Sequence, residues 1–442
     1  MKTSLGWVDI VRLGLVQCAI GSIVALCTST FNRVMVVELA LAASVPAGLV
    51  AWHYAIQMSR PHWGFASDSG ARRTPWIIGG VGVLALGAVM AADAIALMRG
   101  SPILGAALAI LAFTMIGVGV GAAGTSLLAL MAARTAPARR PAAAAITWNL
   151  MIVGIVVTAI AAGGMLDPYS DQRLALVTSG VALIAFLVAL LAVAGVEGEP
   201  VRAEPQAAAA KPRLKDALSE VWRDATARRF TMFVFVSMLA YSTQDLILEP
   251  FAGLIFKLTP GQSTQMSGVQ HMGVLLGMVL VGSLGGALGK YGAGGRIWMR
   301  GWTIGGCAAS ALALAGLAAA ALAGPGWPLK PTVFLLGFAN GIFAVAAIGS
   351  MMGLAGEGGG GREGTRMGVW GAAQAIAFGL GGFMGAAVVD GLRVALHADA
   401  PAFLVVFAAE AGLFALAATL AARVGAADPT VDAAPDAAPM PV

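Results

Sequence analysis

Long apolar runs separated by short polar breaks cover most of this chain. Each run is long enough to cross a bilayer core of about 30 Å as an α-helix. The pattern therefore predicts an all-α membrane protein with twelve transmembrane helices. The predicted spans are 11–31, 42–59, 75–98, 103–132, 142–165, 174–196, 230–252, 266–289, 297–323, 332–355, 367–390 and 401–423.

The composition supports this interpretation. Of the 442 residues, 59% are hydrophobic and 11% are charged, and the mean hydropathy is +0.84. Soluble domains carry about 25% charged residues. Cys18, Cys27 and Cys307 lie in apolar runs, and we expect them to be small buried side chains without a disulfide or zinc-binding pattern. No small-residue cleavage site follows the first run, so we expect that run to be retained as a helix.

Basic residues are divided unevenly between the predicted loops. With both termini in the cytoplasm, 21 of the 27 lysines and arginines fall on the cytoplasmic side. This asymmetry follows the positive-inside rule and predicts cytoplasmic termini. We attribute the net charge of +5 to this topology and to contact with anionic membrane lipids, and we expect no nucleic-acid partner.

The chain is predicted to consist of two six-helix halves, residues 1–196 and 230–424, joined by a cytoplasmic linker at 197–229. Apolar residues recur at helical spacing from Leu214 to Ala225, which predicts an amphipathic helix at the membrane surface within the linker. This segment is interpreted either as a simple connector between the two halves or as a docking helix for a partner. The tail at 425–442 is rich in Ala, Pro and Asp and is predicted to be disordered.

Matching features in the two halves indicate an internal repeat. Span four contains a Gly-x-x-x-Gly pair that span ten repeats, and spans five and eleven both end at an aspartate. The corresponding glycines are Gly117 and Gly337, and Gly121 and Gly341. The corresponding aspartates are Asp167 and Asp390, and spans five and eleven also share a tryptophan, Trp148 and Trp370. Two six-helix repeats of one topology are typical of a large class of membrane transporters.

A charged turn lies between the second and third predicted spans, at residues 60–76. Charges cannot lie in hydrocarbon, so this segment is expected to form a tight loop at the membrane surface. Its Gly64, Asp68, Arg72 and Arg73 resemble the loop between helices 2 and 3 of the major facilitator superfamily. The resemblance implies the major facilitator fold and a latch between the two halves at these four residues. Ser69 and Ala71 depart from the pattern.

The flanking segments are similar to a narrower group, the PucC/LhaA light-harvesting complex assembly family, which is the bacteriochlorophyll delivery branch of the superfamily. The segments that carry this resemblance are 31–39, 52–57, 60–68, 72–80 and 244–251. It implies a chaperone-like role in photosynthesis, in the bacterial inner or intracytoplasmic membrane. The implied partners are light-harvesting antenna polypeptides, bacteriochlorophyll synthase and membrane lipids, and the implied cargo is bacteriochlorophyll.

Histidines in the spans are candidate pigment ligands. His53 lies about 15 Å into the second span, near mid-membrane, with Gln57 one turn away on the same face. An imidazole in lipid needs a partner, which is either the open axial position of a chlorin magnesium or a neighbouring helix. His271, near the outer end of span eight, is a second candidate.

Four charged residues are expected to meet at the periplasmic rim. Asp245 and Glu249 are four residues apart on span seven, and Arg33 and Glu38 reach the same level from span one. Two carboxylates on one face in a low dielectric are not expected to be charged together without a cation nearby. The alternatives are an ion-pair cluster that closes this side and a pair that couples proton movement to transport.

Glu410 is predicted to lie about 14 Å into span twelve, where a lone charge costs several kcal/mol. It is interpreted either as a protonated side chain bonded to a neighbouring helix or as a lipid-facing contact to pigment or a partner helix.

These observations predict an assembly factor for bacterial light-harvesting antenna complexes that binds or delivers bacteriochlorophyll, antenna polypeptides or both. The alternative is a proton-coupled transporter of small solutes. We expect no enzymatic activity, because the sequence contains no nucleophile–base set and no phosphate-binding loop. We also expect no bound metal or other cofactor apart from bacteriochlorophyll as cargo.

Overall fold

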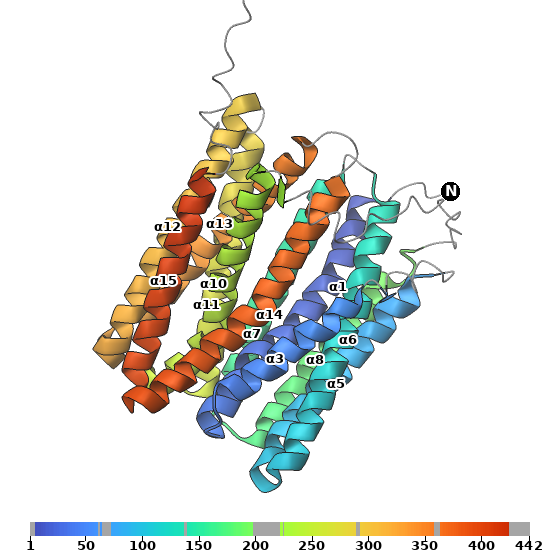
Figure 1. Cartoon of the computed structure of the whole chain (residues 1–442). Helices are drawn as coiled ribbons and strands as arrows, with labels where there is room; N and C mark the ends of the chain where they lie inside the picture. The colour runs from blue at the N-terminus through green and yellow to red at the C-terminus, as the bar shows by residue number, and fades with distance from the viewer. Residues whose placement is uncertain are drawn as a thin grey trace, which may run out of the picture.

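The computed structural model describes residues 5–60, 62–63, 72–136, 139–197, 222–223, 225–288, 292–357 and 363–423. Within these ranges every regular element is a helix, and the helices form one bundle (Figure 1).

The first part of the chain begins with one continuous helical run from Trp7 to Glu38. It is followed by a short helix and then by four long ones. The elements are α1 (Trp7–Ala25), η1 (Leu26–Thr30), α2 (Phe31–Arg33), η2 (Val34–Glu38), α3 (Ser44–Ile56), η3 (Gln57–Ser59), α5 (Thr74–Gly100), α6 (Pro102–Arg134), α7 (Arg140–Leu166) and α8 (Asp171–Val193).

The second part of the chain contributes six long helices and one short 3-10 turn. They are α10 (Ala225–Phe256), α11 (Pro260–Leu288), α12 (Gly292–Ala323), η5 (Gly324–Gly326), α13 (Leu329–Glu357), α14 (Glu363–Leu396) and α15 (Asp399–Arg423).

Eleven helical segments of the described residues are long and apolar enough to cross a membrane. The remaining predicted span, 42–59, corresponds to α3 and η3. Helix α3 has 13 residues and is too short to be counted by length alone. It nevertheless packs within the bundle against α6 and α14. The prediction of an all-α membrane protein is confirmed.

The first span is longer than predicted, because it continues beyond residue 31 to Glu38. The sequence placed its end near Arg33 because a charge is costly in hydrocarbon. In the structure Arg33 is only 2% exposed, and its guanidinium donates hydrogen bonds to Glu38 and to the carbonyl of Leu258. With these partners supplied, the helix continues past Arg33 as the π-helical segment η2.

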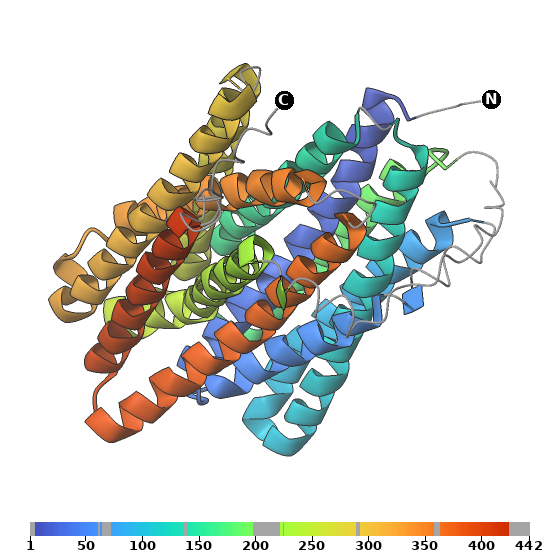
Figure 2. The same cartoon turned by 45° about the horizontal axis from the view of Figure 1, so that its top comes forward.

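The two parts of the chain lie side by side (Figure 1). They meet where α3 packs against α14 and where α7 packs against α11. Helix α1 begins and α15 ends at the same end of the bundle, the upper end in Figures 1 and 2. We call the opposite end, where α7, α10 and α14 finish and α3 and α11 begin, the distal end.

Buried apolar side chains form two large clusters. One lies mostly among α1 to α8 and includes Phe31 and Phe113. The other lies among α10 to α15 and includes Phe251, Phe343 and Phe407. Each part therefore has its own core, whereas the contact between α7 and α11 is made by the small cluster of Ile152, Val156, Val274 and Met278. The predicted division at 196 and 230 stays a prediction.

Helices α11 and α13 pack with their backbones in contact. A Cβ added to Gly337 would lie 1.9 Å from the carbonyl oxygen of Gln270, and one added to Gly341 would lie 2.2 Å from that of Val274. No larger residue fits at either position without moving a helix. The Gly-x-x-x-Gly pair of α13 is thus a close helix-packing contact.

Some predicted features lie outside the described residues. They include most of the amphipathic linker helix at 214–225 and the whole tail at 425–442.

Candidate functional site

A line of aromatic rings connects the two parts of the bundle at its centre. Tyr54 of α3 packs against Phe378 of α14 with ring centroids 6.0 Å apart, and Phe378 packs against Tyr241 of α10 at 5.8 Å. Aromatic pairs at this separation stabilise a contact beyond the area they bury. The tyrosines bring two hydroxyl groups to the middle of the molecule, a feature that the sequence analysis missed because isolated tyrosines carry no spacing pattern.

Asp245 lies one helical turn from Tyr241 on α10. It is half-buried and close enough to Tyr54, Tyr241 and His271 to interact with each electrostatically. These four residues come from α3, α10 and α11, and we call them the central polar cluster. The cluster combines one carboxylate, one imidazole and two phenols, all of which can exchange protons.

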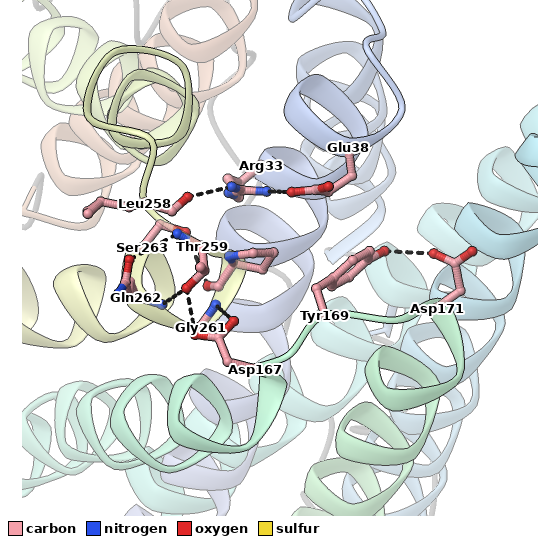
Figure 3. Close-up of polar contacts among 11 residues, drawn as sticks. Arg33, Glu38, Asp167, Tyr169, Asp171, Leu258, Thr259, Gly261, Gln262 and Ser263 are labelled. Atoms are coloured by element: carbon pink, nitrogen blue, oxygen red, sulfur yellow. Dashed lines mark hydrogen bonds and ion pairs between the residues drawn. The ribbon is translucent and has the colours of Figure 1, made fainter.

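The four residues predicted for a charged rim are linked through Glu249, which lies within electrostatic range of both Arg33 and Asp245. Arg33 pairs with Glu38, as Figure 3 shows. Glu249 is 2% exposed and accepts a hydrogen bond from the hydroxyl of Ser29, in the opposite part of the chain. Asp245 also belongs to the central polar cluster. The two carboxylates of the predicted acidic pair on α10 thus remain within electrostatic range of each other, and each has further partners of its own.

His53 is 1% exposed and has both ring nitrogens in hydrogen bonds. Its Nδ1 lies 2.8 Å from the carbonyl of Val50, and its Nε2 lies 2.8 Å from the side-chain nitrogen of Gln57. The amide oxygen of Gln57 accepts a hydrogen bond from Arg60. Gln57 must therefore donate to His53, which places the imidazole proton on Nδ1. In this arrangement the Nε2 lone pair of His53 is already used.

His271 differs from His53 in this respect. Its Nδ1 donates to the carbonyl of Ser267 at 2.9 Å, and the described residues provide no hydrogen bond to Nε2. Histidines that bind metals commonly donate one ring N–H to a backbone carbonyl, which orients the other nitrogen as a ligand. The half-buried His271 has this arrangement.

Glu410 does not face lipid. It is 1% exposed in the core among α10 to α15, and neither carboxylate oxygen has a hydrogen-bond partner in the described part of the chain. Of the two interpretations, the lipid-facing contact is wrong, because the pattern of a single helix does not show which of its faces α10 and α12 cover when they pack against α15.

Of the four residues in the predicted latch loop, Gly64 and Asp68 lie outside the described residues. Arg72 is exposed, and the backbone N–H of Arg73 donates to the carboxylate of Glu197. That carboxylate also accepts from the backbone N–H of Thr74 at 2.8 Å. Glu197 thereby caps the start of α5 from the end of α8, a contact that its position at the edge of the linker did not suggest. Whether the loop latches the two halves stays a prediction.

The electrostatics of Glu197 follow from this cap. Burial raises the pKa of its carboxyl, but the hydrogen bonds from the Arg73 and Thr74 backbone and the nearby Arg73 charge outweigh burial, so the net pKa is lowered.

Among the described residues, no group of three or more His, Cys, Asp or Glu side chains could hold a metal ion. A cleft of about 390 Å³ lies at the distal end and is lined by Asp390, Arg393, His397, Asp399 and the turn at residues 40–42. Arg393 in this cleft bonds to Asp399 at 2.6 Å.

The arrangement of helices defines an all-α membrane protein of the major facilitator fold. The crystal structure of the nucleoside transporter NupG (D323A mutant) matches with a TM-score of 0.67 over 93% of this chain and 99% of that chain. The sequence identity is 14%, so this likeness concerns the fold alone.

Sequence comparisons identify the particular family to which the chain belongs. The family model described as PUCC protein matches residues 30–428, and the chain belongs to this family. It is 28% identical over 439 residues to Protein PucC of Cereibacter sphaeroides, covering 92% of this chain and 90% of the relative. It is 52% identical over 427 residues to a protein of Rhodobacter capsulatus, covering 96% of this chain and 97% of the relative. That relative is named "Bacteriochlorophyll synthase 44.5 kDa chain".

The name of the Rhodobacter capsulatus relative contradicts the prediction about enzymatic activity. The expectation of no enzymatic activity was wrong by this comparison, because a protein 52% identical over nearly the whole chain carries the name of an enzyme chain. The expectation rested on missing nucleophile and phosphate-loop motifs. Such motifs describe only some enzymes, and a chain of a larger synthase need not supply them itself.

Proposed function

We propose that this protein acts in the assembly of bacterial light-harvesting antenna complexes by binding or delivering bacteriochlorophyll, antenna polypeptides or both. The observation that carries the proposal is the PUCC family match over residues 30–428. The relative whose name refers to bacteriochlorophyll adds support for a pigment-related role. Its name also motivates the proposal that bacteriochlorophyll synthase is a partner.

Within this proposal His271 is the favoured axial ligand for a chlorin magnesium, and His53 with Gln57 is the second candidate. The reason is the state of the ring nitrogens: His271 has an Nε2 without a described partner, whereas Nε2 of His53 is bonded to Gln57. Tyr54 and Tyr241 lie within electrostatic range of Asp245, as His271 does, and with Phe378 they would offer aromatic surface for a flat pigment ring.

The orientation and location are part of the same proposal. We propose a bacterial inner or intracytoplasmic membrane protein with both termini in the cytoplasm, so that the distal end faces the periplasm. The uneven distribution of lysine and arginine supports this orientation.

The proposal is tested by purifying the protein in mild detergent from a pigment-producing host and recording its absorption spectrum. Near-infrared absorption and co-purifying antenna polypeptides are the expected result. The matched control is an unrelated major facilitator protein purified from the same host. Equal pigment on both proteins would overturn the proposal, because it would show only that pigment dissolves in the detergent.

The second candidate function is proton-coupled transport of a small solute. The observation that favours it is the central polar cluster, in which Asp245 lies within electrostatic range of His271. It is tested in vesicles by following internal pH when a solute is added. A pH change that Asp245→Asn abolishes, in a protein free of pigment and partners, would favour transport over assembly.

A further inference from the structure

A carboxylate from the first part of the chain caps a helix of the second part. Asp167 directly follows α7 and accepts hydrogen bonds from the hydroxyl of Thr259 at 2.5 Å and from the backbone N–H of Gly261 at 3.2 Å (Figure 3). Gly261 lies in the first turn of α11. A Cβ at this position would lie 2.4 Å from the carbonyl oxygen of Gly163, so only glycine allows the approach.

The reciprocal contact is made by a carboxylate of the second part. Asp390, near the end of α14, accepts hydrogen bonds from the backbone N–H groups of Ala43 at 2.9 Å and Ser44 at 2.7 Å. These groups are at the start of α3, where backbone N–H groups have no partner within their own helix. Each aspartate thus supplies an anion to the positive end of a helix that belongs to the other part.

The turns that present these N–H groups are also alike. Ala40, before α3, has φ of 52°, and Lys257, before α11, has φ of 57°. After each of them, a backbone N–H bonds to a carbonyl six residues earlier: Leu41 to Met35 at 3.0 Å and Leu258 to Ala252 at 3.2 Å. Both are left-handed helix endings whose closing bond spans one residue more than the 6→1 bond of the Schellman motif. The chain therefore builds the same turn and the same cross-cap twice.

We propose that Asp167 and Asp390 form a paired closure that holds the two parts of the bundle together at the distal end. A cap supplied by the helix itself would survive if the two parts moved apart. A cap supplied from the opposite part breaks as soon as they separate, so its hydrogen bonds oppose opening at this end. This inference concerns the conformation of the bundle and does not depend on what cargo the protein carries.

The rest of the distal end agrees with such a closure. Arg33 donates to the carbonyl of Leu258 at 2.6 Å, and Thr30 and Thr264 share a hydrogen bond of 3.1 Å. Asn32 donates to the carbonyl of Leu246. These bonds all join the end of the first span to α10, α11 or the turn between them. The two aspartates flank this line of contacts, at the α7–α11 and α3–α14 interfaces.

The chain offers a matched control at the same end. Asp171 bonds to Arg99 at 2.7 Å and to Tyr169, and all three belong to the first part of the chain. Neutralising Asp171 removes a carboxylate from the distal end without removing a bond between the two parts. Asp399 is unsuitable as a control, because its partner Arg393 also lies 3.9 Å from Asp390.

The experiment is hydrogen–deuterium exchange of the full-length protein in detergent, read on peptides that contain Ala43 and Ser44 or Gly261. In Asp390→Asn we expect amide exchange to rise about tenfold at its own contact, the start of α3. Because the closure is paired, we also expect a rise at the start of α11, and the reverse in Asp167→Asn. Asp171→Asn should change neither site.

Exchange that rises only at the helix whose own cap was removed would overturn the paired closure, because the caps would then act independently. No change at either site would overturn it as well. Thr259→Val, which removes a single hydroxyl donor to Asp167, serves as the milder variant if the asparagine variants do not purify as folded protein. A second measurement uses spin labels at Val45→Cys and Gln262→Cys, in a chain without the three native cysteines. The distance between them should lengthen in the double variant Asp167→Asn/Asp390→Asn and remain unchanged in Asp171→Asn.

Discussion

The side-chain nitrogen of Gln57 lies 2.8 Å from Nε2 of His53, one turn away on the same helix. Because Arg60 donates to the oxygen of Gln57, the amide orientation and the imidazole tautomer are both determined. The buried side chains of His53 and Gln57 therefore satisfy each other, and the exposed Arg60 at the end of η3 supplies the remaining donor.

The first prediction follows from this chain of hydrogen bonds. Gln57→Leu leaves Nε2 of His53 and the Arg60 guanidinium without their shared partner. We expect the free energy of unfolding to fall by about 1–3 kcal/mol, the usual cost of an unsatisfied buried polar group. Thermal unfolding in detergent measures the effect. The control is Met58→Leu, which changes a 74% exposed neighbour and should have little effect.

The second prediction concerns the pigment ligand. If the pigment proposal holds, His271→Ala lowers the bound pigment at least several-fold, because it removes the ring nitrogen that has no described partner. His397→Ala, an exposed histidine at the distal end, should leave the pigment unchanged. The near-infrared absorption per mole of purified protein measures both. A loss in His53→Ala with no loss in His271→Ala would reverse the order of the two candidates.

Glu410 leads to the third prediction, which is an increase in stability. Both oxygens of this buried carboxyl lack a hydrogen-bond partner among the described residues. Glu410→Leu replaces it with an apolar group of similar size, and we expect about 1–3 kcal/mol of stabilisation. The measurement is the unfolding temperature in detergent, with Glu410→Gln as the comparison that keeps the shape and a polar group. A marked destabilisation by leucine would mean that the carboxyl has a partner in the membrane-embedded protein.

The fourth prediction concerns the cap of α5 by Glu197. Because the folded-state pKa is lowered, the cap contributes stability above the usual pKa of 4.5 and loses it as the pH falls through the lowered value. We expect Glu197→Gln to cost roughly 1 kcal/mol at neutral pH. The difference between this variant and the parent should shrink toward zero in acid. Unfolding measured from pH 7 down to pH 3 tests this, and a difference that grows in acid would contradict it.

The fifth prediction tests the contact between α11 and α13. Gly337→Ala places a methyl group 1.9 Å from the carbonyl oxygen of Gln270, and we expect a loss of about 1–3 kcal/mol from the forced separation of the helices. Gly282→Ala is the matched control on α11, since no atom lies within 4 Å of the added methyl group. Equal stability of the two variants would mean that the helices separate at little cost.

The sequence by itself determined the membrane-spanning class, the helical content and the family. These follow from local quantities: the length of each apolar run, the composition, and motifs such as those at 31–39 and 244–251. The glycine pair at Gly337 and Gly341 was also readable, because close helix packing depends on the absence of a side chain.

Only the tertiary structure decided which partner each polar side chain has. Asp245 and Glu249 share a helix face and stay within electrostatic range of each other, but Asp245 also lies near Tyr54 and His271, whereas Glu249 bonds to Ser29. Asp167 and Asp390 were visible as a repeated pair, but their role as caps depends on helices more than 90 residues away. The sequence left two interpretations of Glu410 open, and the structure shows that neighbouring helices bury it. Hydropathy and helical periodicity determine where a residue lies along its own helix, whereas its partners depend on how the other helices pack around it.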